Sequence, residues 1–413
     1  MGFQQGLSGL NATSRNLDVI GHNIANANTT GMKASRAEYG ELVASSLGTG
    51  GGSSAGLGVE VSTVSQQFTQ GNISVTNNDL DVAINGAGFL QLQLPDGSAA
   101  YTRAGELKLD RFGFITTNTG AKVLGYQTDI AGNRLSFSTN PIQLPTAAPI
   151  GANQTTQITA EFNLDAEAVV WNSVVPNTPL TTYGTSLTAY DSQGVPIPVS
   201  MYMRKITDAA GPPVLNRWEI FTDPTSAATA TASTVGTLSF GANGLLVSTA
   251  PAALTIPLTP TNPAVPAFNV TLDVSGATQY GARFAVSDLT QDGYPPGELV
   301  GVKIEENGVI LARYSNGETQ AAGQFAMVNF RNVQGLAPTG NGQWIETLES
   351  GQPIQGAPTE GKFGSLRAGA LEDSNVDLTA ELVNMMTAQR AYQANAQTIK
   401  TQDQVLQTLV NLR

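Results

Sequence analysis

The last stretch of the chain, Asn375–Arg413, reads NVDLTAELVNMMTAQRAYQANAQTIKTQDQVLQTLVNLR and contains neither glycine nor proline. Ser374, Asn375 and Asp377 carry side-chain oxygens that can accept hydrogen bonds from the free N–H groups at a helix start. Apolar residues then recur every seven positions, at Leu378, Met385, Tyr392, Ile399 and Leu406. A weaker row holds Leu382, Ala396 and Val410, interrupted by Gln389 and Asp403. This spacing predicts one long helix with a narrow coiled-coil seam, and such a seam needs a partner helix.

The beginning of the chain carries the same seven-residue repeat, at Phe3, Leu10, Leu17 and Ile24. The run NANTTG at Asn26–Gly31 then predicts a helix end, because Asn and Gly adopt the left-handed conformation cheaply and Thr disfavours helix. We therefore predict that the two terminal helices pair and that the protein assembles through its ends. The alternative is that both helices pack on one globular body.

The composition of the 413-residue chain favours turn-rich β-structure between these helices. The 44 glycines and 21 prolines are unusual for a helical bundle, while 41% hydrophobic residues suffice for real cores. A net charge of −12 argues against a nucleic-acid surface, which would need clustered Lys and Arg. We therefore expect no nucleic-acid partner.

The absence of cysteine excludes disulfides, thiolate nucleophiles and Cys-based metal sites. No apolar run reaches the roughly 18 residues that a membrane-spanning helix needs, so we expect no membrane insertion. The N-terminus lacks a basic segment followed by an apolar run, so we expect no cleaved secretory signal peptide.

Turn signals separate short β-patterned runs throughout the middle of the chain. Turns such as Asn85–Gly88 and Pro95–Gly97 recur at spacings typical of a sandwich or barrel of short strands. Near Pro141–Pro149 the composition shifts toward Thr, Ala and Pro, and the first pattern resumes after about residue 280, as expected for an inserted domain. The predicted fold class is a multidomain, mainly β chain with long α-helices at both termini, paired as a coiled coil, and two nested β-sandwich or barrel-like domains.

The nested pattern predicts four parts of the chain, by residue number. They are a terminal helical coiled-coil domain at 1–30 and 375–413, a connecting segment at 31–70 and 361–374, an inner β-domain at 71–148 and 283–360, and an inserted outer β-domain at 149–282. Each domain is entered and left at neighbouring points, so we expect an elongated molecule with both termini at one end.

The sequence offers no arrangement typical of catalysis. His22 is the single histidine and lies in the first predicted helix. A His/Cys metal site would need further ligands of these types, and a Ser–His triad has only this one candidate base, within a helix. The acidic pair of Asp79 and Asp81 is better explained by exposed turn ends, and Gly86–Gly88 lacks the Lys-Ser/Thr of a phosphate loop. We expect no catalytic residue, no metal site and no cofactor, and an enzyme is the weakest interpretation.

Two long motifs resemble the signatures of one family. The run NLDVIGHNIANANTTGMK at Asn16–Lys33 resembles the N-terminal signature of bacterial flagellar rod and hook proteins, and Ser374–Asp403 resembles the other end of these axial proteins. Asp79–Tyr126 is similar to their shared β-domain. Met32 stands where an aromatic residue is common and His22 where Asn is common, and both are compatible with packing.

The resemblance implies a structural subunit that self-assembles into a tube around a central export channel. The terminal helices would pair as an inner lining, and the β-domains would lie outside. Such a tube acts as a flexible, curved universal joint that transmits torque from rod to filament. Within the family, length and the inserted domain favour the hook subunits over the shorter rod subunits. The alternatives are the distal rod protein of this family and, from another class, an exported β-rich adhesin or binding protein.

The resemblance also implies partners and a location. The partners would be further copies in a helical tubular polymer, the distal rod protein, the hook cap protein, the hook–filament junction proteins and the flagellar type III export apparatus. The location would be the extracellular hook of the bacterial flagellum, reached without a cleaved signal peptide. Phe3–Leu7 resembles the Phe-x-x-x-hydrophobic export signal of early flagellar substrates, formed by Phe3 and Leu7, although both also fit a plain helix seam.

The predicted assembly interface consists of the seam residues on the two terminal helices. These are Phe3, Leu10, Leu17, Ile24, Leu378, Leu382, Met385, Tyr392, Ile399, Leu406 and Val410.

Overall fold

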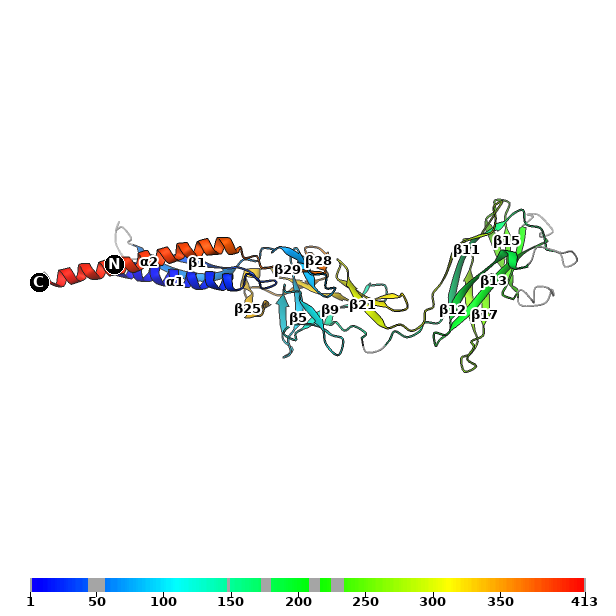
Figure 1. Cartoon of the computed structure of the whole chain (residues 1–413), viewed down its shortest axis with the longest axis horizontal. Coiled ribbons are helices and arrows are strands. Elements are labelled where there is room, and N and C mark those ends of the chain that lie inside the picture. The colour runs from blue at the N-terminus through cyan, green and yellow to red at the C-terminus, as the bar shows by residue number, and fades with distance from the viewer. Residues whose placement is uncertain are drawn as a thin grey trace. The chain divides into compact units, whose positions relative to one another are not determined.

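The computed structural model describes residues 2–43, 56–146, 149–171, 180–207, 216–223 and 234–411 (Figure 1). The chain forms two compact units. The first, here called the terminal unit, comprises Met1–Ala147, Val300–Arg313 and Thr319–Arg413. The second, the inserted unit, comprises Ala148–Leu299 and Tyr314–Glu318. The inserted unit therefore interrupts the terminal unit in sequence.

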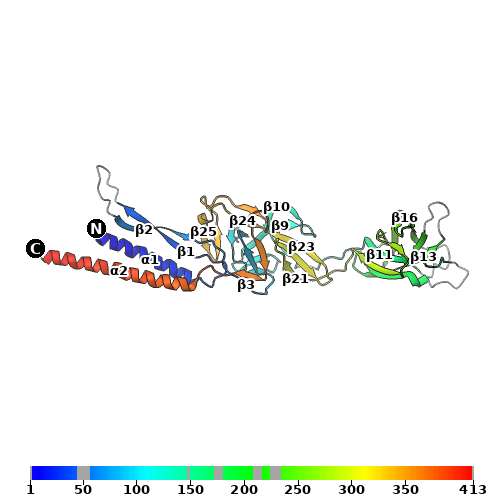
Figure 2. The same cartoon turned by 90° about the horizontal axis from the view of Figure 1, so that it is seen from above.

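Both ends of the chain are helical, with α1 at Gly2–Ala25 and α2 at Leu378–Asn411. The two helices run side by side in opposite directions, and α2 continues past the start of α1 in both views (Figures 1 and 2). The Asp377 carboxylate begins α2 by accepting from the N–H groups of Thr379 (2.9 Å) and Ala380 (3.1 Å). Asn375, a second predicted start residue, instead bonds to other segments of the chain, as described below.

A two-stranded ribbon follows α1 and packs along it. It pairs β1 (Ser35–Val43) with β2 (Gly56–Gln66) in antiparallel register. The ribbon lies within the predicted connecting segment, where the imperfect alternation of Val59, Val61 and Val64 indicates only a possible strand. Part of the Gly48–Gly58 connector, residues 48–55, lies outside the described residues.

The β-part of the terminal unit is built around one long path of strands, ordered β21-β22-β23-β9-β5-β6-β26-β25, to which β7, β8, β10, β24 and β27 are joined. Two short pairs, β3 with β29 and β4 with β28, link the returning chain to the entering chain. The strands are β3 (Ile73–Val75), β4 (Val82–Asn85), β5 (Phe89–Gln93), β6 (Ala99–Thr102), β7 (Leu107–Leu109), β8 (Ile115–Thr117), β9 (Lys122–Thr128), β10 (Arg134–Pro141), β21 (Leu299–Ile304), β22 (Val309–Tyr314), β23 (Thr319–Phe325), β24 (Met327–Asn329), β25 (Ala337–Gly340), β26 (Gln343–Ile345), β27 (Ile354–Gly356), β28 (Ser365–Ala368) and β29 (Ala370–Glu372).

The two larger hydrophobic cores of this part differ in character. The larger is aliphatic and draws on residues far apart in sequence, among them Ile84, Leu92 and Ile310, all fully buried. The smaller is aromatic: Phe89 and Trp344 meet edge to face with ring centroids 5.6 Å apart. Trp344 also donates from Nε1 to Gln66 Oε1 of the ribbon (2.6 Å), so the aromatic core is tied to the end of β2.

The inserted unit is a β-sandwich. One sheet has the order β12-β13-β14-β15-β16, and the other has the order β17-β18-β11-β19 with β20 paired to β11. Burial alternates along β11 and β13, and the buried residues of both sheets form one core. The strands are β11 (Gln157–Asp165), β12 (Gly184–Tyr190), β13 (Pro196–Ile206), β14 (Asn216–Phe221), β15 (Thr234–Phe240), β16 (Leu246–Ala250), β17 (Leu254–Leu258), β18 (Phe268–Asp273), β19 (Thr278–Tyr280) and β20 (Ala285–Gln291).

The prediction of a mainly β chain with a long helix at each end is confirmed. Pairing of the helices as a coiled coil stays a prediction, because only part of the contact between them involves the predicted apolar rows. The predicted domain boundaries also stay predictions, although the predicted insertion at 149–282 lies inside the inserted unit at Ala148–Leu299.

Candidate assembly surface

Small and polar residues form the contact between α1 and α2. A Cβ added at Gly6 would lie 3.0 Å from Ile399 Cγ1, and one at Gly9 would lie 2.9 Å from Asn395 Nδ2. At the other end of the pair, Asn23 Nδ2 donates to Glu381 Oε1 (3.1 Å). The glycines thus allow the helices to approach closely, with amide and carboxylate groups closing the contact.

The most buried helix residues are not the predicted seam residues. Apart from Gly6, the buried ones among the described helix residues are Ala12, Ile20, Asn23 and Ala388. The sequence pattern does not indicate burial of Ala12, Asn23 or Ala388, because Ala and Asn give no strong hydrophobic signal. Burial of Asn23 depends on a distant partner: the Asn23 Nδ2 donates to the carbonyl of Ser35 at 2.8 Å. Ile399 of the predicted rows takes part in the contact between the helices, and Ala12, Asn23, Ala388 and Asn395 lie outside those rows.

The predicted seam residues divide into two groups in the single chain. Leu10, Leu17, Ile24, Met385 and Ile399 are partly buried. Leu378, Leu382 and Tyr392 are exposed, and so are the neighbouring Val383 and Met386. The side chains of Phe3, Leu406 and Val410 lie outside the described residues.

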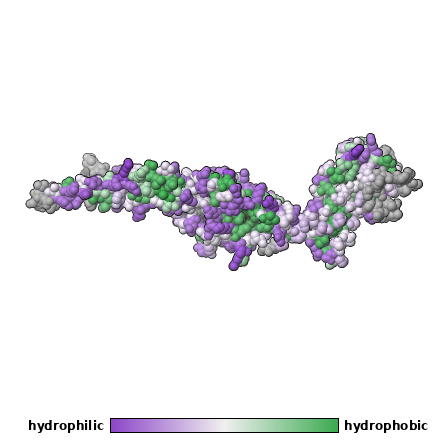
Figure 3. All heavy atoms as spheres, viewed as in Figure 1, coloured by the Kyte–Doolittle hydropathy of each residue, from purple (hydrophilic) through white to green (hydrophobic). Residues whose placement is uncertain are grey.

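The exposed group forms one surface at the start of α2. We call Leu378, Leu382, Val383 and Met386 the α2 patch; these side chains are between 46% and 53% exposed. Residues three or four apart share a helix face, so the four side chains are neighbours. Hydrophobic residues are visible over the paired helices in Figure 3. Contiguous apolar surfaces are common at interaction sites of proteins.

A groove of about 590 Å³ runs between the helices and the β1–β2 ribbon. Its walls come from all four elements and include Ala12, Asn16, Tyr39, Ala388 and Asn395. Small side chains and amides dominate the walls, so the groove has the character of a packing surface. Among the described residues, no group of three His, Asp or Glu side chains is placed to hold a metal ion.

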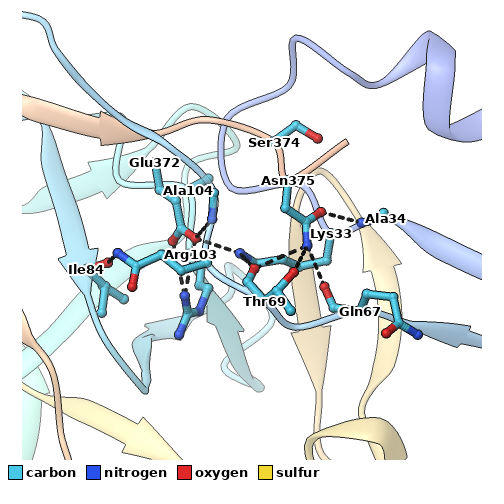
Figure 4. Close-up of polar contacts among 12 residues, drawn as sticks. Lys33, Ala34, Gln67, Thr69, Ile84, Arg103, Ala104, Glu372, Ser374 and Asn375 are labelled. Carbon is cyan, nitrogen blue, oxygen red and sulfur yellow. Dashed lines mark hydrogen bonds and ion pairs between the residues drawn. The ribbon is translucent and has the colours of Figure 1, made fainter. Parts of the chain in front are cut away.

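A buried cluster of charges joins the helical part of the terminal unit to its β-part (Figure 4). Glu372, just before α2, accepts from Lys33 Nζ at 2.6 Å and from Arg103 Nη1 at 3.2 Å. The side chains of Lys33 and Glu372 are fully buried. Glu372 also accepts from the N–H of Gly71 at 2.9 Å. One carboxylate therefore connects the segments that follow α1, β2 and β6.

Asn375 adds a second connection at the same place (Figure 4). Its Oδ1 accepts from the N–H of Ala34 (2.7 Å), and its Nδ2 donates to the carbonyl of Gln67 (2.7 Å). Together with the Glu372 cluster this forms what we call the joint. The joint fixes where the chain leaves α1 and where it enters α2.

The electrostatics of the joint are set by burial. Burial lowers the pKa of the Lys33 ammonium from its ordinary value, although the hydrogen bond and the charge of Glu372 act in the opposite direction. Lys33 Nζ is further satisfied by the carbonyl of Thr69 at 2.8 Å, and Arg103 Nη2 by that of Gly86 at 2.7 Å. Such a cluster is costly to break, because loss of one partner leaves an uncompensated buried charge.

Gly31 allows this approach at the end of the N-terminal motif. Its φ is +69°, and an added Cβ would lie 2.6 Å from the nitrogen of Ala104. Its N–H donates to the carbonyl of Glu372 at 2.7 Å. The Gly31 of the motif is thus needed both for its conformation and for contact with the β-part.

In the described ranges no helix has the length and apolarity to cross a membrane. The arrangement offers packing surfaces, a buried joint and a long partly exposed helix.

Four family models match successive parts of the chain. They are described as flagella basal body rod protein (residues 3–33), flagellar hook protein FlgE/F/G D1 domain (83–164), flagellar basal body protein FlaE D2 domain (163–294) and flagellar basal body rod FlgEFG protein C-terminal (367–412).

Several curated relatives match over their whole length. The chain is 41% identical to the flagellar hook protein FlgE of Escherichia coli K12 over 420 residues, covering 100% of both chains. It is 39% identical to that of Salmonella typhimurium over 426 residues, with the same coverage. The flagellar hook protein FlgE of Treponema pallidum is 32% identical, over 99% of this chain and 98% of its own.

Among solved structures, the crystal structure of Helicobacter pylori flagellar hook protein FlgE2 has a similar fold. The TM-score is 0.53 at 15% identity, with 72% of this chain and 100% of that chain covered.

Proposed function

This chain belongs to the flagellar hook protein family, and from that premise we propose that it self-assembles through its terminal helices into the hook. The family is structural: the hook is the flexible curved tube that transmits torque from rod to filament and surrounds an export channel. The full-length similarity to hook proteins favours this role over that of the distal rod protein.

The observation that carries the proposal is the exposure of the α2 patch. The contact with α1 uses small residues, so the large apolar side chains of Leu378, Leu382 and Met386 remain half exposed in the single chain. Burial of a Leu side chain is worth about 2 kcal/mol, so several of them covered by neighbouring copies favour polymerisation. Contacts between unlike surfaces of identical subunits allow open-ended growth.

The other predicted properties form part of the same proposal. The terminal helices pair as a coiled coil with those of neighbouring copies, and the seam residues named above contribute to this interface. The protein reaches the extracellular hook through the flagellar export apparatus without a cleaved signal peptide, with Phe3 and Leu7 as export signal. Its further partners are the distal rod protein, the hook cap protein and the hook–filament junction proteins.

Electron microscopy of the purified chain under polymerising conditions tests the proposal. The comparison is a chain limited to residues 32–376, which keeps Lys33, Glu372 and Asn375 of the joint. We expect tubes from the full chain and a soluble monomer from the shortened chain. Two monomeric samples, with ordered terminal helices in the full chain, would contradict assembly through the ends.

A further inference from the structure

The register of the helix pair leaves the last part of α2 without α1 beside it. Asn23 bonds to Glu381 at one end of the pair, and Gly6 faces Ile399 near the other. By this register the start of α1 lies opposite about residue 403. The following residues of α2, Gln404–Asn411, therefore extend past α1 by about 12 Å, as both views show (Figures 1 and 2).

This extension, here called the overhang, has an apolar and uncharged sequence. It reads QVLQTLVN, with four apolar residues in eight. Val405 is 48% exposed in the single chain. A helix end without packing partners frays readily, so a surface that covers the overhang would stabilise it.

The α2 patch has matching properties at the opposite end of the same helix. From Leu378 to Met386 it spans about 12 Å, close to the length of the overhang. Its four members are apolar, and the nearby carboxylate of Glu381 is engaged by Asn23. Neither segment presents a like charge to the other, so contact between them meets no electrostatic repulsion.

We propose that the overhang of one copy packs on the α2 patch of the next copy. The inference rests on the proposed hook function and names the contact that links successive subunits. Because the two surfaces lie at opposite ends of one helix, each copy donates its overhang and receives another, and the contact repeats without closing. The occupant of the α2 patch is thus a second copy of this chain.

Disulfide cross-linking tests this contact cleanly, because the chain contains no cysteine. The variant carries Met386→Cys and Val405→Cys. Within one chain these positions are about 28 Å apart along α2, whereas a disulfide requires Cα atoms within about 7 Å. Any disulfide therefore joins two copies.

The expected result is a ladder of covalent multimers on a non-reducing gel after tubes of the double variant are oxidised. Either single variant gives at most a dimer. The matched control pairs Thr398→Cys with Val405→Cys. Thr398 is exposed but lies on another face of α2 than Met386 and the α2 patch, so we expect no ladder from this control.

Tubes of the double variant that give no ladder of covalent multimers would overturn the proposed contact but would not contradict the hook function. Wild-type protein that forms no tubes would overturn the hook function and the contact with it. If the double variant does not polymerise, copies with Met386→Cys and copies with Val405→Cys are mixed with wild type. A dimer that forms in the mixture and not in either single sample supports the contact, and its absence from mixed tubes contradicts it.

Discussion

At the scale of single residues, Glu372 is the residue that connects the segments of the joint. Its carboxylate is the only anion bonded to both buried cations, Lys33 and Arg103, among the described residues. The cluster thus holds two positive groups against one negative group, and the hydrogen bonds to backbone carbonyls compensate for the imbalance. Removal of the negative group should therefore cost more than loss of an exposed ion pair.

Glu372→Gln should lower the free energy of unfolding of the terminal unit by about 3–5 kcal/mol, because two buried cations lose their counter-charge. Scanning calorimetry measures this, with the transition of the inserted unit as internal reference. The control is Glu38→Gln, which removes the exposed ion pair with Arg36 and should cost less than about 1 kcal/mol. Equal effects of the two substitutions would contradict a structural role for the joint.

The surroundings of Asp292 predict that the stability of the inserted unit depends on pH. Burial acts to raise the pKa of Asp292, but hydrogen bonds from the Thr156 hydroxyl and from the N–H groups of Gln157 and Thr156 outweigh it and hold the pKa below 3.8. Because the folded-state pKa is lowered, the stabilisation is complete above pH 3.8 and is lost as the pH falls through the folded-state value.

Asp292→Asn should therefore lower the free energy of unfolding by about 1 kcal/mol at pH 7, allowing for partial solvent exposure. The difference from wild type should shrink below pH 3.8. Urea titrations at several pH values measure this, with Asp288→Asn as a control at an exposed position of β20. A difference that stays constant down to the lowest pH would rule out the carboxylate as its origin.

Phe3 and Leu7 allow export and assembly to be separated. Phe3→Ala should reduce secretion severalfold if the export apparatus binds this side chain. Leu7→Ala should have the same effect, because Leu7 is exposed on α1. The measurement is the secreted fraction in a flagellated strain, with Leu10→Ala as a seam control. Normal secretion with defective tubes would leave Phe3 only its role in the helix seam.

At the scale of elements, α2 presents two different surfaces. One holds Ala388 and Asn395 and faces α1, where glycines allow close approach. The other is the α2 patch, whose large side chains have little to contact in the single chain. Stability of the monomer and polymerisation should therefore respond to different substitutions on one helix.

Leu382→Ser together with Met386→Ser should abolish or strongly slow tube formation and change the unfolding temperature of the monomer little. Both side chains are about half exposed, so the folded monomer loses little burial and the polymer loses most. Light scattering and calorimetry measure the two effects. The control, Gln389→Ser with Gln393→Ser, changes exposed polar residues of the same helix. Tubes that grow at the wild-type rate would exclude the patch from the interface.

At the scale of the whole molecule, the inserted unit has its own core, and its long segment Ala148–Leu299 has backbone hydrogen bonds between its two ends. Ile150 donates from its N–H to the carbonyl of Gly297 at 2.8 Å, and Asn153 bonds in the same way to Tyr294 at 3.0 Å. Residues 150 and 297 are therefore adjacent, and a short linker can connect them when residues 151–296 are removed.

Replacing residues 151–296 by a short Gly–Ser linker should leave tube formation intact and change the curvature or stiffness of the tube. The physical reason is that the helices and the α2 patch belong to the terminal unit. Electron microscopy gives curvature and persistence length, with wild type beside the variant. Complete loss of polymerisation, in a variant whose terminal unit unfolds at its normal temperature, would show that the inserted unit is required for assembly.

Sequence patterns alone were enough to predict the two terminal helices and the turn-rich β-structure between them. These follow from local patterns: the seven-residue repeat, Asp377 at the start of α2 and the Asn-Gly turns. Family membership also followed from sequence, because its motifs are long and contiguous.

Only the tertiary structure decided which helix face meets α1, how far α2 extends past it, and where the joint lies. Lys33, Arg103 and Glu372 are far apart in sequence, and nothing local to any of them indicates burial. Likewise, Gly6, Asn23 and Ala388 lack a hydrophobic signal and acquire their role from a partner segment. Contacts of this kind depend on which distant groups the fold brings together, and periodicity within one segment carries no information about that.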